Sequence, residues 1–220
     1  MQPGYIAIGQ TLALLGMVAT VLLALAGMVV FLLLNRIRIA RIAALLGMGV
    51  FGAYAAVLLT LSLTSQTRTL PPGQLKYFCE IDCHVAFDVV SQPVRIGDTL
   101  QLTLRERFRR ETISARRGDA PLMPGTRIIA LVDEKGELFP PIESHQLDAA
   151  PMFAPMRPGE VHRAQLRFLV PADAKLRGLL VETDEPFAKL LIGHERSPLH
   201  GKVLLDLTAA AEVASERRTN

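Results

Sequence analysis

Two uninterrupted apolar runs dominate the first third of the chain, at residues 6–34 and 42–64. Neither run contains a charged side chain, and each exceeds the roughly 20 residues that an α-helix needs to cross the hydrocarbon core of a bilayer. A connector at residues 35–41 separates the runs and carries Arg36, Arg38 and Arg41. The pattern predicts a transmembrane helical hairpin over residues 1–64, in contact with membrane lipid.

The connector also predicts the orientation of the hairpin, because short loops rich in lysine and arginine stay on the cytoplasmic side of a membrane. Its arginines are the first charged residues of the chain, and the next is Arg68. We therefore expect a two-pass protein of a bacterial inner membrane, with both termini and the C-terminal domain on the periplasmic side. The first run has no basic leading region and is longer than a signal-peptide core, so we expect it to be retained.

Beyond the hairpin the pattern changes to a period of two, which is typical of half-buried β-strands. A polar linker is expected at residues 65–76, and apolar and polar residues then alternate at 100–105 and 163–170. Further candidate strands lie at residues 127–132, 178–182, 188–192 and 202–207, and residues 77–89 would alternate as one straight strand. Short strands at this spacing predict an all-β antiparallel sandwich over residues 77–207. Residues 208–220 are expected to form a loose C-terminal tail.

Three motifs of this domain follow one another in a defined order. A D-x-x-G turn at residues 133–136 comes after a strand, and a P-G-E turn at residues 158–160 leads into a strand that ends in F-x-V-P at residues 168–171. Their order and spacing resemble an immunoglobulin-like domain family of unknown function, found in bacterial lipoproteins and membrane-anchored proteins. The resemblance implies an immunoglobulin-like sandwich and an exported location, and it implies no activity.

The charge balance separates the hairpin from the rest of the chain. The protein has 24 basic residues, and taking away the three arginines of the connector leaves 21, equal to the 21 acidic residues. The basic character therefore comes from the membrane loop, whereas nucleic-acid binding needs a basic face on the folded domain. We expect no nucleic-acid partner.

Both cysteines stand in the sequence Cys79-Glu80-Ile81-Asp82-Cys83-His84. On one straight strand they would be about 13 Å apart, at roughly 3.3 Å per residue, which is too far for a disulfide. A turn at residues 80–82 would bring Cys79 and Cys83 together, and an even cysteine count in an oxidising compartment favours that bond. Two unpaired thiols remain the alternative.

The same cluster offers ligands to a cofactor. C-x-x-x-C-H is one residue longer than the usual haem-attachment motif, and two thiolates with an imidazole suit copper or zinc. A hairpin anchor with an exported β domain and C-x-x-x-C also resembles subunit II of haem-copper oxidases, although Ile81 stands here where that family has a glutamate. Copper, zinc or haem at Cys79, Cys83 and His84 is therefore an alternative to a protein without a cofactor. His194 and His200 would join such a site if the fold brought them close.

Two further features point to protein contacts. The proline-rich stretch at residues 139–158 is expected to be irregular, and its apolar side chains either fold back over the sandwich edge or press on a partner. Its candidate contact residues are Met152, Phe153 and Met156. Small residues at steps of three and four lie on one face of each predicted helix and would allow close helix packing in lipid. They include Gly16 and Ala24 in the first helix and Gly49 and Ala53 in the second.

These patterns contain no complete catalytic constellation, and we assign no catalytic residue. The leading hypothesis is a non-catalytic accessory or scaffolding subunit that contacts other membrane subunits, in a complex such as an electron-transport or photosynthetic assembly. The alternative is a periplasmic metal-, haem- or thiol-redox protein that uses Cys79, Cys83 and His84.

Overall fold

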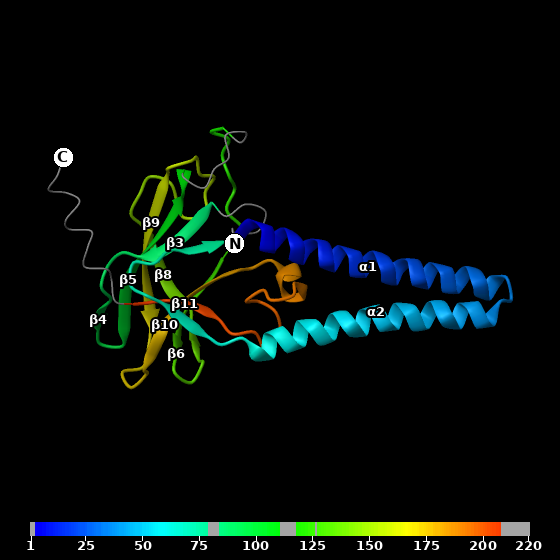
Figure 1. Cartoon of the computed structure of the whole chain (residues 1–220). Helices are drawn as coiled ribbons and strands as arrows, with labels where there is room; N and C mark the ends of the chain where they lie inside the picture. The colour runs from blue at the N-terminus through cyan, green and yellow to red at the C-terminus, as the bar shows by residue number, and fades with distance from the viewer. Residues whose placement is uncertain (1–2, 79–83, 111–117, 126, 208–220) are drawn as a thin grey trace. The chain divides into compact units, whose positions relative to one another are not determined.

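The computed structural model describes residues 3–78, 84–110, 118–125 and 127–207 (Figure 1). The chain divides into two compact units. The hairpin unit comprises residues 1–66 together with Pro186–Gly201, and the sandwich unit comprises residues 67–185 and 202–220. The return of Pro186–Gly201 to the hairpin unit was not predicted, because that stretch follows the strands of the sandwich in sequence.

The hairpin unit is built on two long helices, α1 (Pro3–Leu33) and α2 (Ile37–Thr64), which lie side by side (Figure 1). Between them Asn35 adopts a left-handed φ of 57°, and the backbone N–H of Arg36 donates to the carbonyl of Phe31, which closes α1. The connector is therefore shorter than the predicted residues 35–41. Arg38 and Arg41 belong to α2, because the chain turns within three residues and arginine favours a helix.

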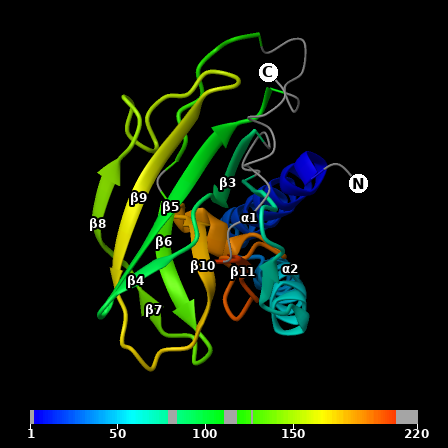
Figure 2. The ribbon, with the colours of Figure 1, turned by 90° about the vertical axis from the view of Figure 1, so that its left-hand side faces the viewer.

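The sandwich unit consists of two β-sheets that enclose an apolar core. The first sheet has the strand order β1 (Arg68–Leu70), β11 (Val203–Leu205), β10 (Leu176–Thr183), β6 (Arg127–Asp133) and β7 (Leu138–Phe139). The second has the order β2 (Lys76–Phe78), β3 (Val85–Val89), β5 (Thr99–Phe108), β9 (Val161–Leu169) and β8 (Pro141–Gln146), with β4 (Val94–Ile96) paired to β5. β1 pairs with β11 in parallel, and the other described ladders are antiparallel. Figure 2 shows β8, β9 and β5 next to one another as one sheet.

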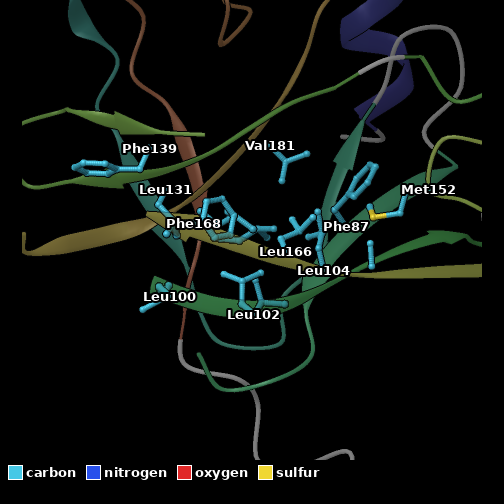
Figure 3. Close-up of a cluster of buried hydrophobic side chains, with 14 of the residues drawn as sticks. Phe87, Leu100, Leu102, Leu104, Leu131, Phe139, Met152, Leu166, Phe168 and Val181 are labelled. Atoms are coloured by element: carbon cyan, nitrogen blue, oxygen red, sulfur yellow. The ribbon is translucent and has the colours of Figure 1, made fainter. Parts of the chain in front are cut away.

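The two long alternating strands position the core, as their sequence predicts. β5 and β9 pair in an unbroken register that sets Leu102 opposite Leu166 and Leu104 opposite Ala164. Their inward side chains meet Leu131 and Val181 of the other sheet, and Phe87 and Met152 lie in the same cluster (Figure 3). The prediction of a sandwich with two sheets is confirmed at this level.

Of the two alternatives for residues 77–89, the straight strand is excluded, because β2 and β3 are separate strands that pair antiparallel with Phe78 opposite Val85. Three details of the prediction are wrong. The expected linker at residues 65–76 contains β1 and the first residue of β2. The expected strand at residues 188–192 overlaps the 3₁₀ helix η2 (Pro186–Leu190), and the expected irregular loop at residues 139–158 contains β8. In each case a short apolar or polar run is compatible with more than one kind of element, and its contacts with distant segments determine which one forms.

Candidate functional site

The surface of the hairpin unit is apolar. The spans Gly9–Leu33 and Ile37–Thr64 are long and apolar enough to cross a membrane, and only 6% and 11% of their most apolar windows are buried. Large side chains such as Leu23 and Leu33 are 74% and 83% exposed. A continuous exposed apolar surface of this kind is typical of contact with lipid or with other proteins.

The two helices pack closely where a glycine faces an alanine. A Cβ added at Gly47 would lie 2.9 Å from the Cβ of Ala24, which is closer than two such atoms approach in proteins. The buried Gly47 therefore allows α1 and α2 to pack tightly at this level. Ala24, predicted as a contact for a partner, contacts the other helix of the same hairpin instead.

Closer to the free ends of the helices the same faces open into a shallow hollow of about 330 Å³. Small residues on both helices contribute to its lining, among them Gly16 of α1 and Ala53 of α2. The full lining is Ala13, Gly16, Met17, Thr20, Val50, Ala53, Tyr54, Val57 and Ile192. Gly49 lies outside the hollow, and a Cβ added there would meet nothing within 4 Å. Three of the predicted contact positions are therefore accessible on the helix surface, as contact with another molecule would require. They are Gly16, Ala53 and Gly49.

The segment Pro186–Gly201 contacts the hairpin at the level of this hollow. The Tyr54 hydroxyl donates to the Leu190 carbonyl at 2.7 Å, and the Gly201 N–H donates to the Ser65 hydroxyl at 2.6 Å. Ser197 is buried, and its hydroxyl donates to the carbonyl of Leu191. The first two bonds hold the segment to α2 and to Ser65, the residue that follows α2.

The predicted metal ligands are divided between the two units. His84 belongs to the sandwich unit, whereas His194 and His200 belong to the hairpin unit. The rings of His194 and His200 are each held locally. Nδ1 of His194 accepts the N–H of Arg196 at 3.0 Å, and Nδ1 of His200 lies 2.7 Å from the Gly201 carbonyl. Among the described residues no three His, Cys, Asp or Glu side chains form a group that suits a metal ion.

Of the cysteine cluster at residues 79–84, the structure describes only His84. Cys79 and Cys83 lie outside the described residues, so their disulfide and their cofactor binding stay predictions. His84, which follows them, is 6% exposed, and its ring stacks on Phe108 with 5.5 Å between the centroids.

The proline-rich stretch folds back onto the sandwich at the three residues that were predicted to contact a partner. Met152 and Met156 are 7% and 0% exposed, and Phe153 packs against the core cluster. Met156 also exchanges two backbone hydrogen bonds of 2.8 Å with Leu122. The interpretation of Met152, Phe153 and Met156 as partner contacts is therefore wrong, because the apolar side chains complete the domain's own core.

A buried carboxyl group lies at the end of strand β5. Glu106 is 0% exposed, its Oε2 accepts the N–H of Phe153 at 2.9 Å, and His162 Nδ1 lies 3.8 Å from the same oxygen. Desolvation raises the pKa of Glu106 to about 7, against the opposing effects of the Phe153 hydrogen bond and the positive charge of Arg127. Phe153 takes a left-handed φ of 66°, which turns its N–H toward this group.

Our sequence reasoning missed Glu106, although a signal was present. Glu106 continues the inward set of Leu102 and Leu104 on β5, and His162 continues the inward set of Ala164 and Leu166 on β9. A charged residue at an inward position of a long alternating strand indicates a buried titratable group.

Cations also enter the interior between the two sheets. Lys76 is 5% exposed, and its Nζ donates to the carbonyls of Val181 at 2.6 Å and Val203 at 2.8 Å. Its Nζ lies 5.3 Å from the ring centre of Phe78, and the guanidinium carbon of Arg127 lies 4.5 Å from the same ring. These contacts satisfy charges that would otherwise be costly to bury.

Comparisons with known proteins identify no family. No protein-family model matches the chain, and no curated protein matches it. Among solved structures it is similar to MPT63, a secreted protein from Mycobacterium tuberculosis, with 12% sequence identity and a TM-score of 0.35. The alignment covers 56% of this chain and 93% of that one. A likeness this distant carries no argument about activity or partners.

Proposed function

We propose that this chain is a membrane-anchored periplasmic accessory subunit, whose hairpin spans a bacterial inner membrane and docks against a helix of another membrane subunit. The observation that carries the proposal is the open hollow between α1 and α2, with Gly16 and Ala53 in its lining. The subunit is non-catalytic, and the sandwich is its exported, protein-contacting domain.

The hollow has the chemistry of a helix-packing surface. Its lining is apolar except for two hydroxyls, and both hydroxyls are already bonded: Thr20 donates to the Gly16 carbonyl at 2.8 Å, and Tyr54 to Leu190. Helices associate in lipid through close backbone approach at small residues, since lipid tails give no hydrophobic driving force. A partner helix would find small residues and no unsatisfied polar group.

The orientation and the finer fold class belong to the same proposal. Arg38 and Arg41 in the first turns of α2 support a cytoplasmic connector, which places both termini and the sandwich on the periplasmic side. The turn at Asp133 supports the immunoglobulin-like assignment, because its carboxylate accepts the N–H groups of Lys135 and Glu137 and Gly136 takes a φ of 83°.

The test is purification of the tagged full-length protein from its native membranes in mild detergent, with mass spectrometry of the subunits that accompany it. We expect the wild type to retain a stoichiometric membrane subunit, and Gly16→Leu to lose it because the leucine fills the hollow. Gly52→Leu is the matched control, since Gly52 is an exposed glycine of α2 outside the hollow.

Two results would contradict the proposal. The first is a wild-type protein that leaves the membrane as a solitary monomer. The second is about one equivalent of copper, zinc or haem on that solitary protein, which would favour the redox alternative at Cys79, Cys83 and His84.

A further inference from the structure

The segment Pro186–Gly201 lies at a defined level along the membrane helices. Tyr54, which binds Leu190, is thirteen residues after Arg41, or about 20 Å along α2 at 1.5 Å per residue. Gly16, which shares the hollow with Ile192, is seventeen residues before the end of α1, or about 26 Å. A hydrocarbon core of about 30 Å that begins at the connector extends beyond both levels.

The segment exposes three large apolar side chains and shields its polar ones except Lys189. Phe187, Leu190 and Leu199 are 70%, 51% and 71% exposed. In contrast, Ser197 is 2% exposed, and His194, Glu195, Arg196 and His200 are half-buried. A loop in water has the opposite pattern, because its polar side chains gain by hydration and its apolar ones do not.

The backbone of the segment is bonded within the unit. A turn hydrogen bond recurs every three residues, in which the N–H groups of Leu191, His194, Ser197 and His200 donate to the carbonyls of Ala188, Leu191, His194 and Ser197. The Tyr54 and Ser197 hydroxyls add bonds to the carbonyls of Leu190 and Leu191. Non-helical backbone is tolerated at membrane depth only where its polar groups find such partners.

We infer that Pro186–Gly201 is a third membrane-embedded element, which binds the lipid of the periplasmic leaflet through Phe187, Leu190 and Leu199. Its occupant is lipid, because the exposed side chains continue the apolar surface of α1 and α2 at the level of the bilayer. Lys189 is the exposed charged side chain within this fully described segment, and its long stem lets the ammonium reach the lipid phosphates. The inference rests on the proposed spanning hairpin, and it gives the chain a lipid-binding surface beyond the two helices.

The experiment uses the absence of tryptophan from the sequence. Single tryptophans are placed in the full-length protein as Phe187→Trp and Leu199→Trp. Ile96→Trp is the control in the sandwich, because Ile96 is 68% exposed, and Leu23→Trp is the control in α1, at a side chain that is 74% exposed. Each variant is reconstituted into vesicles of phosphatidylethanolamine and phosphatidylglycerol whose acyl chains are brominated near the glycerol backbone or near the terminal methyl.

We expect bromine near the glycerol backbone to quench the tryptophans at 187 and 199 at least about twofold more than the one at 96, as for aromatic side chains at a membrane interface. The tryptophan at 23 lies ten residues before the end of α1, or about 15 Å, near the middle of the hydrocarbon core, so bromine near the terminal methyl is expected to quench it most. If 23 is quenched and both 187 and 199 behave like 96, the inference is wrong and the membrane anchor stands. If 23 is not quenched, the spanning hairpin itself is wrong. If the tryptophan at 96 is quenched as strongly as those at 187 and 199, the whole sandwich adsorbs to the membrane. That result would also contradict specific membrane insertion of Pro186–Gly201.

Discussion

The hairpin unit and the sandwich unit use leucine in opposite ways. Leu23 of α1 is 74% exposed, whereas Leu104 of β5 and Leu131 of β6 are 0% exposed. Charged side chains differ as well, since Arg163 and Arg167 lie on the outside of the sandwich in ion pairs with Asp148 and Glu143, whereas α1 carries no charged residue. The comparison shows that the hairpin unit exposes an apolar surface of the kind a membrane span has, whereas the sandwich unit buries Leu104 and Leu131 in its own core.

The largest expected effect is in the sandwich core. Phe168→Ala removes a fully buried ring and should lower the free energy of unfolding by about 3–5 kcal/mol. Leu169→Ala, at the neighbouring side chain that is 57% exposed, should change it by less than about 0.5 kcal/mol. Pulse proteolysis of the full-length protein in urea and mild detergent measures both, and equal losses would contradict a water-facing outer surface.

An acidic substitution at an exposed leucine distinguishes the two solvents. Leu23→Asp should raise the free energy of membrane insertion by about 3–4 kcal/mol, because a carboxylate replaces a leucine within a spanning helix. Leu169→Asp places the same group on the outside of the sandwich and should leave insertion unchanged. The fraction of protein that resists alkaline extraction from membranes reports the difference. Unchanged insertion of Leu23→Asp would show that α1 does not face lipid.

Glu106 makes the sandwich sensitive to pH. In the unfolded chain this carboxyl loses its proton near pH 4.5, whereas burial holds the proton in the folded state up to about pH 7. The folded state therefore binds more protons between these values, and stability should fall by about 3 kcal/mol as the pH rises through this window.

Two matched variants measure how much Glu106 contributes to this pH dependence of stability. Glu106→Gln cannot ionise, so it should remove most of the fall in stability. Glu143→Gln, at an exposed glutamate of β8, should keep it. Unfolding curves measured across the window test this, and an identical pH dependence of wild type and Glu106→Gln would exclude Glu106 as the cause.

The smallest expected effect concerns the packing of the two helices. Gly47→Ala places a methyl group 2.9 Å from the Cβ of Ala24 and forces α1 and α2 apart, whereas Gly49→Ala meets nothing within 4 Å. We expect Gly47→Ala to be less stable than Gly49→Ala by about 1–2 kcal/mol. Unfolding by sodium dodecyl sulfate, followed by helical circular dichroism, compares them. Equal stability would mean that the helices do not pack at Gly47.

Much of the fold is readable from the sequence, for a physical reason. Uninterrupted apolar runs predict α1 and α2, and the period of two predicts β5 and β9, since each pattern matches one geometry over many residues. Short stretches are different. The run at residues 188–192 fits a strand as well as a turn of helix, and its contact with the hairpin, where the Tyr54 hydroxyl donates to the Leu190 carbonyl, decides the outcome.

The candidate sites were less predictable, because they depend on pairing between distant segments. Gly16 and Ala53 follow from the spacing of small residues, but the contribution of Ile192 to their hollow depends on a segment far along the chain. For Met152 and Met156 the predicted partner contact was wrong. A methionine-rich loop has the same composition whether it covers its own core or a partner, so the sequence does not distinguish the two.

The most direct test of the account is the topology of the full-length protein in a bacterial inner membrane. Alkaline phosphatase or green fluorescent protein is fused to the C-terminus in one pair of proteins and inserted at the connector after Asn35 in another. The account predicts active phosphatase and no fluorescence at the C-terminus, with the opposite result at the connector. A fluorescent C-terminal fusion with inactive phosphatase would place the sandwich in the cytoplasm and contradict the proposed periplasmic subunit.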